Sequence, residues 1–187
     1  MKDSLSEIAK IISELSEKRE YLIAAIDGRC ASGKTTLASS LSEFFDCNVI
    51  HMDDFFLRPK QRTAERLNTP GGNIDHERFL DEVFLPLRER RAFSFRPFNC
   101  SKQDLGASVY VPLKKINIIE GSYSCHPRLW DHYDLRFFMS VTSEEQMHRI
   151  IRRNGGEKAE IFKNKWIPLE EKYFSEFKIE ERCDYRF

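Results

Sequence analysis

The alternation of apolar and polar positions predicts an amphipathic helix followed by a series of buried strands. Within residues 1–19, apolar residues recur at helical spacing between charged ones from Leu5 to Leu15, so we expect a helix over 4–19. Further along, short apolar runs are long enough for buried strands. These runs are Tyr21–Ile26, Asn48–Met52, Ile116–Ile119 and Leu135–Val141.

Helical patterns separate these strands. Apolar spacing predicts a helix over Thr35–Phe45, and acidic residues early with arginines late predict another over Asp75–Arg90. We expect Ser143 to cap a helix that runs to about Arg153, and a last helix over roughly Leu169–Phe177.

The remaining segments are shorter or irregular. Short strands are expected at Phe93–Phe98 and Val109–Val111, and the polar segment Phe55–Asn73, rich in proline and glycine, is expected to be a functional or mobile loop. No repeat or linker divides the chain, so we expect one domain over residues 1–187. Strands alternating with helices predict an α/β fold, with a parallel sheet covered on both faces.

Composition narrows the classes of function. The 187 residues include 30 basic and 30 acidic ones, and a chain of zero net charge is a poor general binder of nucleic acid. The five cysteines form no C-x-x-C pair, which disfavours a disulfide framework or a zinc site. Residues 1–20 are charged throughout and lack the apolar core of a signal peptide. No apolar run reaches transmembrane length. We therefore expect a cytoplasmic protein without a membrane partner.

The stretch Gly28–Thr35 reads G-R-C-A-S-G-K-T and fits the pattern G-x-x-x-x-G-K-[ST] without departure. Glycines let such a turn point backbone N–H groups at phosphate oxygens, and the following helix adds its positive dipole end. Lys34 is expected to reach the β- and γ-phosphates, and the Thr35 hydroxyl to ligate Mg²⁺. A plain glycine-rich connection is the alternative, but the pattern arises by chance in roughly one such chain in a hundred. The expected nucleotide-binding residues are Gly28, Ala31, Ser32, Gly33, Lys34, Thr35 and Thr36.

Acidic residues follow two of the predicted strands. Asp53 comes after the strand that ends at Met52, and Glu120 comes directly after Ile116–Ile119. Ligands of open parallel sheets collect at the carboxyl ends of the strands, so both carboxylates are expected beside the phosphate-binding turn. Glu120 fits a group that holds a water ligand of Mg²⁺, and Asp53 fits a group that accepts a proton from an attacking hydroxyl. The alternative is that these carboxylates are simply solvated.

The predicted helix before Gly155 and Gly156 carries three arginines on one side: Arg149, Arg152 and Arg153. The paired glycines give a hinge, so residues 142–165 are expected to form a lid. Arginines that a lid brings in stabilise the charge of a transferring phosphoryl group. The alternative is a solvated helix end at which cations meet the dipole.

Several motifs in this order resemble the uridine kinase and phosphoribulokinase group of P-loop small-molecule kinases. After the phosphate-binding turn come M-D-D-F-F at 52–56, N-I-D-H-E-R-F at 73–79, V-Y-V-P-L-K-K-I-N-I-I-E-G at 109–121 and H-R-I-I-R-R at 148–153. The likeness covers most of residues 20–175. The D-D-F-F and I-D-H pieces in this order are much more specific than the P-loop alone.

The resemblance implies a three-layer P-loop fold with about five parallel strands, and roles for individual residues. By position, Asp53 matches the catalytic aspartate and Glu120 the acidic group near the metal. The other catalytic and ATP-contacting candidates are Lys34, Arg149, Arg152 and Arg153. Asp75 matches an aspartate that contacts the acceptor sugar, and the acceptor-binding candidates beside it in the same motifs are Asp54 and His76.

The chain departs from uridine kinases in the middle hairpin. After the hairpin proline, uridine kinases usually place a tyrosine and an aspartate, and a histidine further on, to hold the base. Here residues 97–103 read P-F-N-C-S-K-Q. A site built to hydrogen-bond a base edge loses much discrimination without those groups. The resemblance therefore favours a kinase without favouring uridine as its acceptor.

The sequence predicts an ATP- and Mg²⁺-dependent kinase that phosphorylates a hydroxyl of a small metabolite, either a nucleoside or a sugar-like alcohol. A regulatory GTP-binding protein is an alternative, but Asn164-Lys165 lacks the aspartate of N-K-x-D. A nucleic-acid-dependent ATPase is disfavoured by the zero net charge. A degenerate kinase fold that binds metabolites without turnover stays open. So does a homo-oligomer, because the helix at 4–19 could pack on its own sheet or on a partner.

Overall fold

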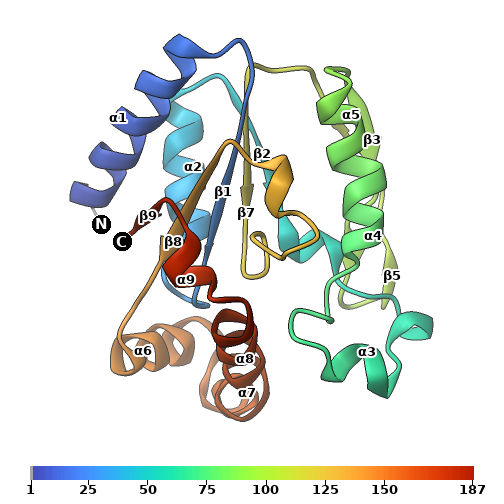
Figure 1. Cartoon of the computed structure of the whole chain (residues 1–187). Coiled ribbons are helices and arrows are strands. Elements are labelled where there is room, and N and C mark those ends of the chain that lie inside the picture. Colours follow the sequence, from blue (N-terminus) through green and yellow to red (C-terminus); the bar gives the residue numbers. More distant parts are fainter. Residues whose placement is uncertain (1) are drawn as a thin grey trace.

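The computed structural model describes residues 2–187, and its centre is a five-stranded parallel sheet (Figure 1). The strands lie in the order β2-β7-β1-β8-β9, and each neighbouring pair is parallel. Their bounds are Cys47–His51 for β2, Ile116–Glu120 for β7, Leu22–Gly28 for β1, Leu135–Met139 for β8 and Tyr185–Arg186 for β9. The three-layer α/β fold is confirmed. The hydrophobic pattern did not predict β9, because two residues are too few to show a period.

The middle strands are buried on both faces. Every residue of β1 and β7 is buried, and Ala24 of β1 pairs with Ile118 of β7 on one side and Leu135 of β8 on the other. Helices on both faces leave no polar side to such strands, so they read as continuous apolar runs in the sequence. The sheet therefore gives the strand ends a rigid support.

Helices α1 (Lys2–Lys18) and α2 (Lys34–Phe44) cover one face of the sheet (Figure 1). Ile8 and Ile12 of α1 are fully buried in the same apolar cluster as Leu41 of α2 and the middle strands. The amphipathic face of the N-terminal helix thus packs on its own sheet. This contact accounts for the apolar stripe without a partner chain.

The opposite face is covered by one helical rod, which consists of α4 (His76–Phe79), the π-helical turn η3 (Leu80–Phe84) and α5 (Leu85–Arg88). The expected helix over 75–90 is confirmed apart from its ends. Asp75 is its N-cap, since the carboxylate accepts a hydrogen bond from the Arg78 N–H.

Short elements connect this rod to the sheet. The polar segment expected as a loop, Phe55–Asn73, begins at the last residue of η1 (Met52–Phe55) and contains η2 (Pro59–Gln61) and α3 (Ala64–Asn68). The middle hairpins consist of β3 (Phe93–Phe95) with β6 (Val109–Val111), and β4 (Phe98–Asn99) with β5 (Asp104–Leu105). A further short helix, η4 (Trp130–His132), precedes β8.

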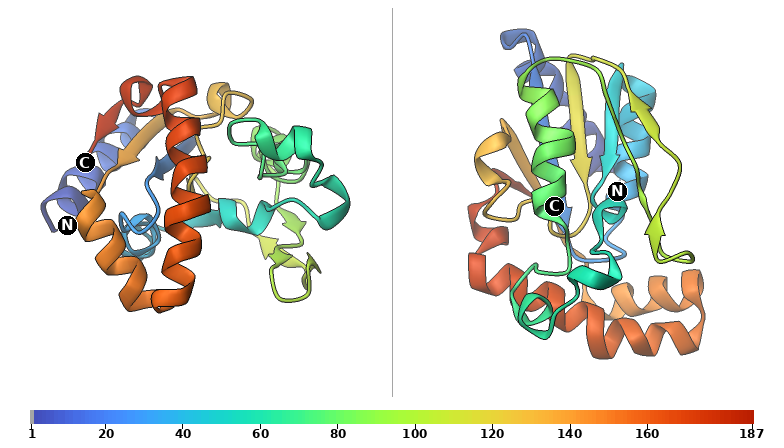
Figure 2. Two further views of the ribbon diagram at one scale, coloured as in Figure 1. Left: turned by 90° about the horizontal axis from the view of Figure 1, so that it is seen from below. Right: turned by 90° about the vertical axis from the view of Figure 1, so that its right-hand side faces the viewer.

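The C-terminal helices lie across the end of the sheet where the strands finish (Figure 2). They are α6 (Ser143–Asn154), α7 (Gly156–Ile161), the π-helical turn η5 (Phe162–Trp166), α8 (Ile167–Phe177) and α9 (Ile179–Arg182). Thr142, not Ser143, is the N-cap of α6, because its hydroxyl accepts from the Glu145 N–H. Among residues 2–187, no helix combines the length and apolar character that a membrane span requires.

Candidate active site

The phosphate-binding turn joins β1 to α2 with the backbone geometry that its glycines allow. Gly28 has a φ of 135°, and a Cβ there would lie 2.0 Å from the Met139 carbonyl oxygen of β8. Gly33, at the N-cap of α2, has a φ of 104°. Left-handed backbone at these points is open to glycine and strained for other residues. The turn thereby aims the N-terminus of α2, where N–H groups lack helical partners, toward the ends of the strands.

Lys34 is the first residue of α2, and its side chain lies back over the turn. The ammonium donates to the carbonyl oxygens of Gly28, at 2.7 Å, and of Arg29, at 2.8 Å. Only 7% of the residue is exposed. Two carbonyl oxygens of the turn therefore hold the cation close to the N-terminus of α2, where an anionic phosphate would be stabilised.

A cleft of about 700 Å³ lies above this turn and collects most of the residues that the sequence predicted. Its lining includes Ala31, Gly33, Lys34, Thr35, Thr36, Asp53, Glu120, Arg149, Arg152 and Arg153. Gly28 and Ser32 belong to the same turn but do not line the cleft, and neither do Asp54, Asp75 and His76. The structure thus brings the expected phosphate, metal and base residues together and separates the acceptor candidates from them.

Glu120, at the end of β7, faces Thr35 and His51. The Thr35 hydroxyl donates to Glu120 Oε1 at 3.1 Å, and the same oxygen lies 2.5 Å from His51 Nδ1. This hydrogen bond raises the pKa of His51 above its ordinary value. A hydroxyl and a carboxylate are oxygen ligands that suit Mg²⁺, which keeps waters and substrate phosphates as its other ligands. The pair therefore fits a magnesium site that a nucleotide completes.

Asp53 stands in η1, directly after β2. Its side chain faces the open cleft and is accessible to water, yet protein atoms surround it closely. Desolvation by these atoms raises the pKa of Asp53, and the nearby Lys34 cation opposes the rise. A carboxylate with a raised pKa is a better proton acceptor than an ordinary aspartate.

Helix α6 is docked on the phosphate-binding turn. Arg149 Nη1 donates to the Ala31 carbonyl oxygen at 3.1 Å, and Gln146 Nε2 donates to the Cys30 carbonyl oxygen at 3.0 Å. The guanidinium of Arg149 is oriented by Glu145, one helical turn earlier, at 2.7 Å. Backbone carbonyls of the turn thus fix the face of α6 that carries the arginines.

Glu170 of α8 is a site residue that the sequence interpretation missed. Only 6% of it is exposed, and its carboxylate accepts from the Cys30 N–H at 2.9 Å and from the Ser122 hydroxyl at 2.8 Å. Burial raises the pKa of Glu170, and Lys34 opposes this. A sequence signal existed, because Glu170 shares the apolar face of its helix with Tyr173 and Phe174. A carboxylate on an apolar face requires buried partners.

The variable positions of the turn are explained by contacts with the C-terminal helices. Arg29 forms ion pairs with Glu171, at 2.7 Å, and with Glu180, at 3.1 Å, and it donates to the Ser140 hydroxyl. Its guanidinium also lies over the Phe174 ring. Arg29 therefore ties the turn to β8, α8 and α9 from outside the cleft.

Asp27 supports the turn from below as a fully buried carboxylate. It accepts hydrogen bonds from the backbone N–H groups of Gly28, Tyr123 and Cys125 and from the Tyr173 hydroxyl. Burial, the largest cause, raises the pKa of Asp27 to about 6 against the effect of these donors. The carboxylate joins the turn to the segment after β7 and to α8.

The acceptor candidates Asp75 and His76 lie beside a second, smaller cleft of about 320 Å³. Asp75 lines it and is only 2% exposed, with its carboxylate accepting from the Arg78 N–H at 3.1 Å and from Gln61 Nε2 at 2.7 Å. His76 is stacked on His126 with ring centroids 4.4 Å apart, and burial lowers the pKa of His76 to about 4.

Known structures share this architecture. No protein-family model matches the chain. A possible uridine kinase from Bacillus stearothermophilus is 21% identical with a TM-score of 0.66, and the match covers 97% of this chain and 99% of that chain. A candidate fructose transport system kinase from Silicibacter sp. TM1040 is 18% identical with a TM-score of 0.69, over 96% and 98% of the two chains. YFH7 from Saccharomyces cerevisiae, a candidate P-loop kinase with a circular permutation, is 12% identical with a TM-score of 0.64, over 93% and 94%. The chain therefore has the fold of P-loop kinases, uridine kinase-like structures among them.

Proposed function

We propose that the protein is an ATP-dependent kinase that transfers a phosphoryl group to a hydroxyl of a small metabolite, a nucleoside or a sugar-like alcohol. One observation carries this proposal: a single cleft joins the phosphate-binding turn, the strand-end acids Asp53 and Glu120, and the arginine face of α6. Phosphate binding alone would need only the first of these. Transfer to an acceptor needs all of them.

The nucleotide side of the mechanism follows from the turn. The N–H groups of the turn and of α2 bind the ATP phosphates, and Lys34 moves from its carbonyl partners to the β- and γ-phosphate oxygens. Thr35 and Glu120 would hold Mg²⁺, which when bound neutralises charge on the phosphates. Arg149, Arg152 and Arg153 stabilise the charge on the transferring group.

Asp53 acts on the acceptor. It orients the acceptor hydroxyl in line with the γ-phosphate and takes its proton as the new O–P bond forms and ADP leaves. Its surroundings raise the pKa of Asp53, which favours this proton transfer. Residues of α6 and α8 line the cleft, and exclusion of water by the bound substrates would protect the phosphoryl group from hydrolysis.

The test is turnover of ATP–Mg²⁺ with a panel of nucleosides, free sugars and vitamin precursors. Wild type should phosphorylate an acceptor from this panel, and Asp53→Asn should be slower by roughly 10²- to 10⁴-fold, the contribution of general base catalysis. Asp81→Asn makes the same change on the exposed side of the helical rod, outside the cleft, and should retain full activity. Equal rates for Asp53→Asn and wild type would contradict the role of Asp53. Binding of ATP without turnover across the panel would favour the alternative of a regulatory nucleotide-binding protein.

A further inference from the structure

The short turn η1, which carries Asp53, is anchored to the start of the helical rod. The Asp54 carbonyl oxygen accepts a hydrogen bond from Arg78 Nη2 at 2.7 Å, and the Phe55 carbonyl oxygen accepts from the Asp75 N–H at 2.7 Å. A 3₁₀ turn of four residues has few and poorly aligned hydrogen bonds of its own, so contacts from outside determine where it lies. One end of the rod thus holds two successive carbonyl groups of η1.

Arg78 is a buried cation that also joins η1 to the middle hairpins. Only 8% of the residue is exposed, and its Nη1 donates to the Arg96 carbonyl oxygen at 2.7 Å, between β3 and β4. The guanidinium lies over the Phe55 ring, 4.3 Å from the ring centroid. Because the guanidinium is planar and rigid, its two terminal nitrogens fix the separation between η1 and the hairpin.

The surroundings of Arg78 do not make it an ordinary ion pair. Burial lowers the pKa of Arg78, and the carboxylate of Glu82 opposes this from 3.8 Å away, too far for a hydrogen bond. Within residues 2–187, the Nε of Arg78 has no hydrogen-bond partner. Well-packed apolar residues often serve stability as well as a buried charge does. The two short hydrogen bonds to backbone carbonyls therefore point to a role in geometry.

Arg78 has no direct access to the reacting groups. Asp53 lines the large cleft, whereas Arg78 lines neither of the two clefts. The charged groups that act most on Asp53 are Lys34 and Glu120, both of which line the same cleft. Arg78 instead contacts the backbone of the next residue, Asp54. Its connection to the Asp53 carboxylate is therefore through the position of η1.

We propose that Arg78 is a positioning residue for Asp53, and that its guanidinium holds η1 against the rod and the middle hairpin so that the carboxylate meets the acceptor hydroxyl in line with the γ-phosphate. This inference rests on the proposed kinase function, in which Asp53 takes the proton of the acceptor. A displacement of about 1 Å at such a group slows a reaction by up to roughly 10²-fold, so a support outside the cleft matters to the rate.

A double-mutant cycle on the full chain tests this inference, with whichever of uridine, adenosine, D-ribose or D-fructose wild type phosphorylates fastest. Arg78→Met keeps an apolar stem over Phe55 and removes both hydrogen bonds. It should lower kcat by roughly 10- to 100-fold and change the KM for ATP less than twofold. Arg78→Lys keeps the charge and one donor, so it should recover part of the rate. In the Asp53→Asn background, Arg78→Met should lower kcat less than twofold further, because the base that it positions is already absent.

Two controls separate positioning from a loss of folding. Arg88→Met makes the same change at the exposed end of the rod and should leave kcat unchanged. Calorimetry with a non-hydrolysable ATP analogue and Mg²⁺ should give Arg78→Met an affinity within twofold of wild type, which shows that the variant is folded. If Arg78→Met does not fold, Arg78→Lys replaces it in both measurements, with a smaller effect expected.

A second measurement applies even if none of these probes is phosphorylated. Carbon-13 NMR of the carboxyl groups, assigned with Asp53→Asn, would follow the titration of Asp53 in wild type and in Arg78→Met. Desolvation raises the pKa of Asp53, so release of η1 toward water should lower that pKa toward its ordinary value. Loss of a positive charge alone would raise it.

Three results would overturn the inference. They are a wild-type kcat in Arg78→Met, an effect of Arg78→Met that is equally large with Asp53→Asn, and a pKa of Asp53 that does not fall in Arg78→Met. A pKa that falls in a protein that phosphorylates none of the four probes would contradict the kinase proposal for them and leave Arg78 as the support of η1.

Discussion

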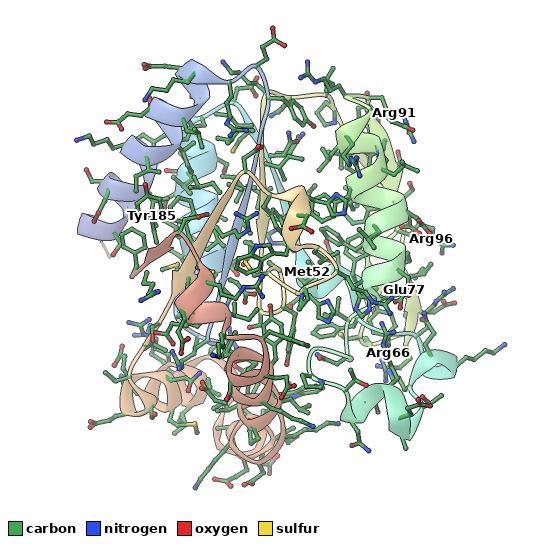
Figure 3. The ribbon with its side chains drawn as sticks, viewed as in Figure 1. Met52, Arg66, Glu77, Arg91, Arg96 and Tyr185 are labelled. Carbon is green, nitrogen blue, oxygen red and sulfur yellow. The ribbon has the colours of Figure 1, made fainter. Side chains whose placement is uncertain are left out.

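The two sides of the cleft are held together in different ways. The phosphate-binding turn is tied to segments more than a hundred residues away, through Arg29, Arg149 and Glu170. The 57–72 connection is instead held mainly by its own neighbours. Arg66 donates to the Gly72 and Ile74 carbonyl oxygens and pairs with Glu77 at 2.8 Å (Figure 3).

Because the turn and the 57–72 connection are held in different ways, substitutions in them should have different consequences. A change in the turn disturbs β8, α6 and α8 at once, because their contacts converge on it. A change within 57–72 reaches fewer distant segments, chiefly that of Gln103 through Arg62 and that of Lys172 through the Asn68 carbonyl oxygen. Under the proposed function, the chain would keep its nucleotide site while changes in the 57–72 connection alter which acceptor fits. Substitutions on one side of the cleft at a time test this comparison.

The largest effect is expected at His76, the first residue of the helical rod. Burial and then Arg66 lower the pKa of His76 to about 4, below its ordinary 6.5. A histidine with a depressed folded-state pKa contributes stability that is present above pH 6.5 and lost as the pH falls toward 4. The shift corresponds to about 3 kcal/mol at low pH. His76→Phe keeps a ring on His126 and removes the titration, so urea unfolding at pH 4.5 and 7.5 should show a smaller loss than wild type. If both proteins lost equal stability at pH 4.5, the titration of His76 would not be the cause.

A slightly smaller effect of opposite sign is expected at Asp27, beneath the turn. Its pKa is raised from 3.8 to about 6, so the folded state keeps a proton that the unfolded state has released between these values. Stability therefore falls by about 3 kcal/mol as the pH rises from 4 to 6. Asp27→Asn removes this dependence of stability on pH, whatever the substitution does to the overall free energy of unfolding. The two opposing slopes partly cancel in wild type, so each has to be read as the difference between wild type and its variant.

A third prediction concerns Glu170, whose removal leaves the Cys30 N–H and the Ser122 hydroxyl without a partner. Glu170→Ala should lower stability by about 1–3 kcal/mol and weaken ATP-analogue binding about tenfold, because the turn loses a backbone support. Glu170→Gln keeps an acceptor oxygen, so it should recover part of the stability and part of the affinity for the ATP analogue. Glu176→Ala, an exposed change on the same helix, is the control. If calorimetry gives wild-type affinity for Glu170→Ala, the carboxylate does not support the turn.

The sequence predicted the glycine-rich turn between β1 and α2 because the information that determines it is local. Glycines at fixed spacing, a lysine and a threonine determine a turn whose context, a buried strand and a helix, is readable from hydrophobic periodicity. The partners of that turn were not readable, because a sequence without an alignment does not say which distant residue faces Arg29. Glu170 could have been found only as a carboxylate on an apolar helix face.

The acceptor side was less predictable for a physical reason. A motif preserves residue types, whereas the direction of a side chain depends on tertiary contacts. Asp75 matches the family pattern by position, yet helix capping and Gln61 occupy its carboxylate. Asn73, two residues earlier, carries no recognisable signal, since asparagine in a polar loop is ordinary. Asn73 lines the large cleft, which the sequence alone could not show.

The smallest effect is expected at Arg29, where the tie between the turn and the C-terminal helices is partly exposed. Glu171 and Glu180 are 44% and 40% exposed, so water and salt screen both ion pairs, and their loss should cost less than about 1 kcal/mol. Arg29→Met keeps an apolar stem over Phe174, whereas Arg29→Ala also removes packing and should cost more. Melting temperatures at low and high salt separate these contributions. At 1 M salt the melting temperature of Arg29→Met should equal that of wild type. The melting temperature of Arg29→Ala should stay below that of wild type by most of the difference seen at low salt. If both variants lost their difference equally, the contact would be purely electrostatic, and packing would not hold α8 against the turn.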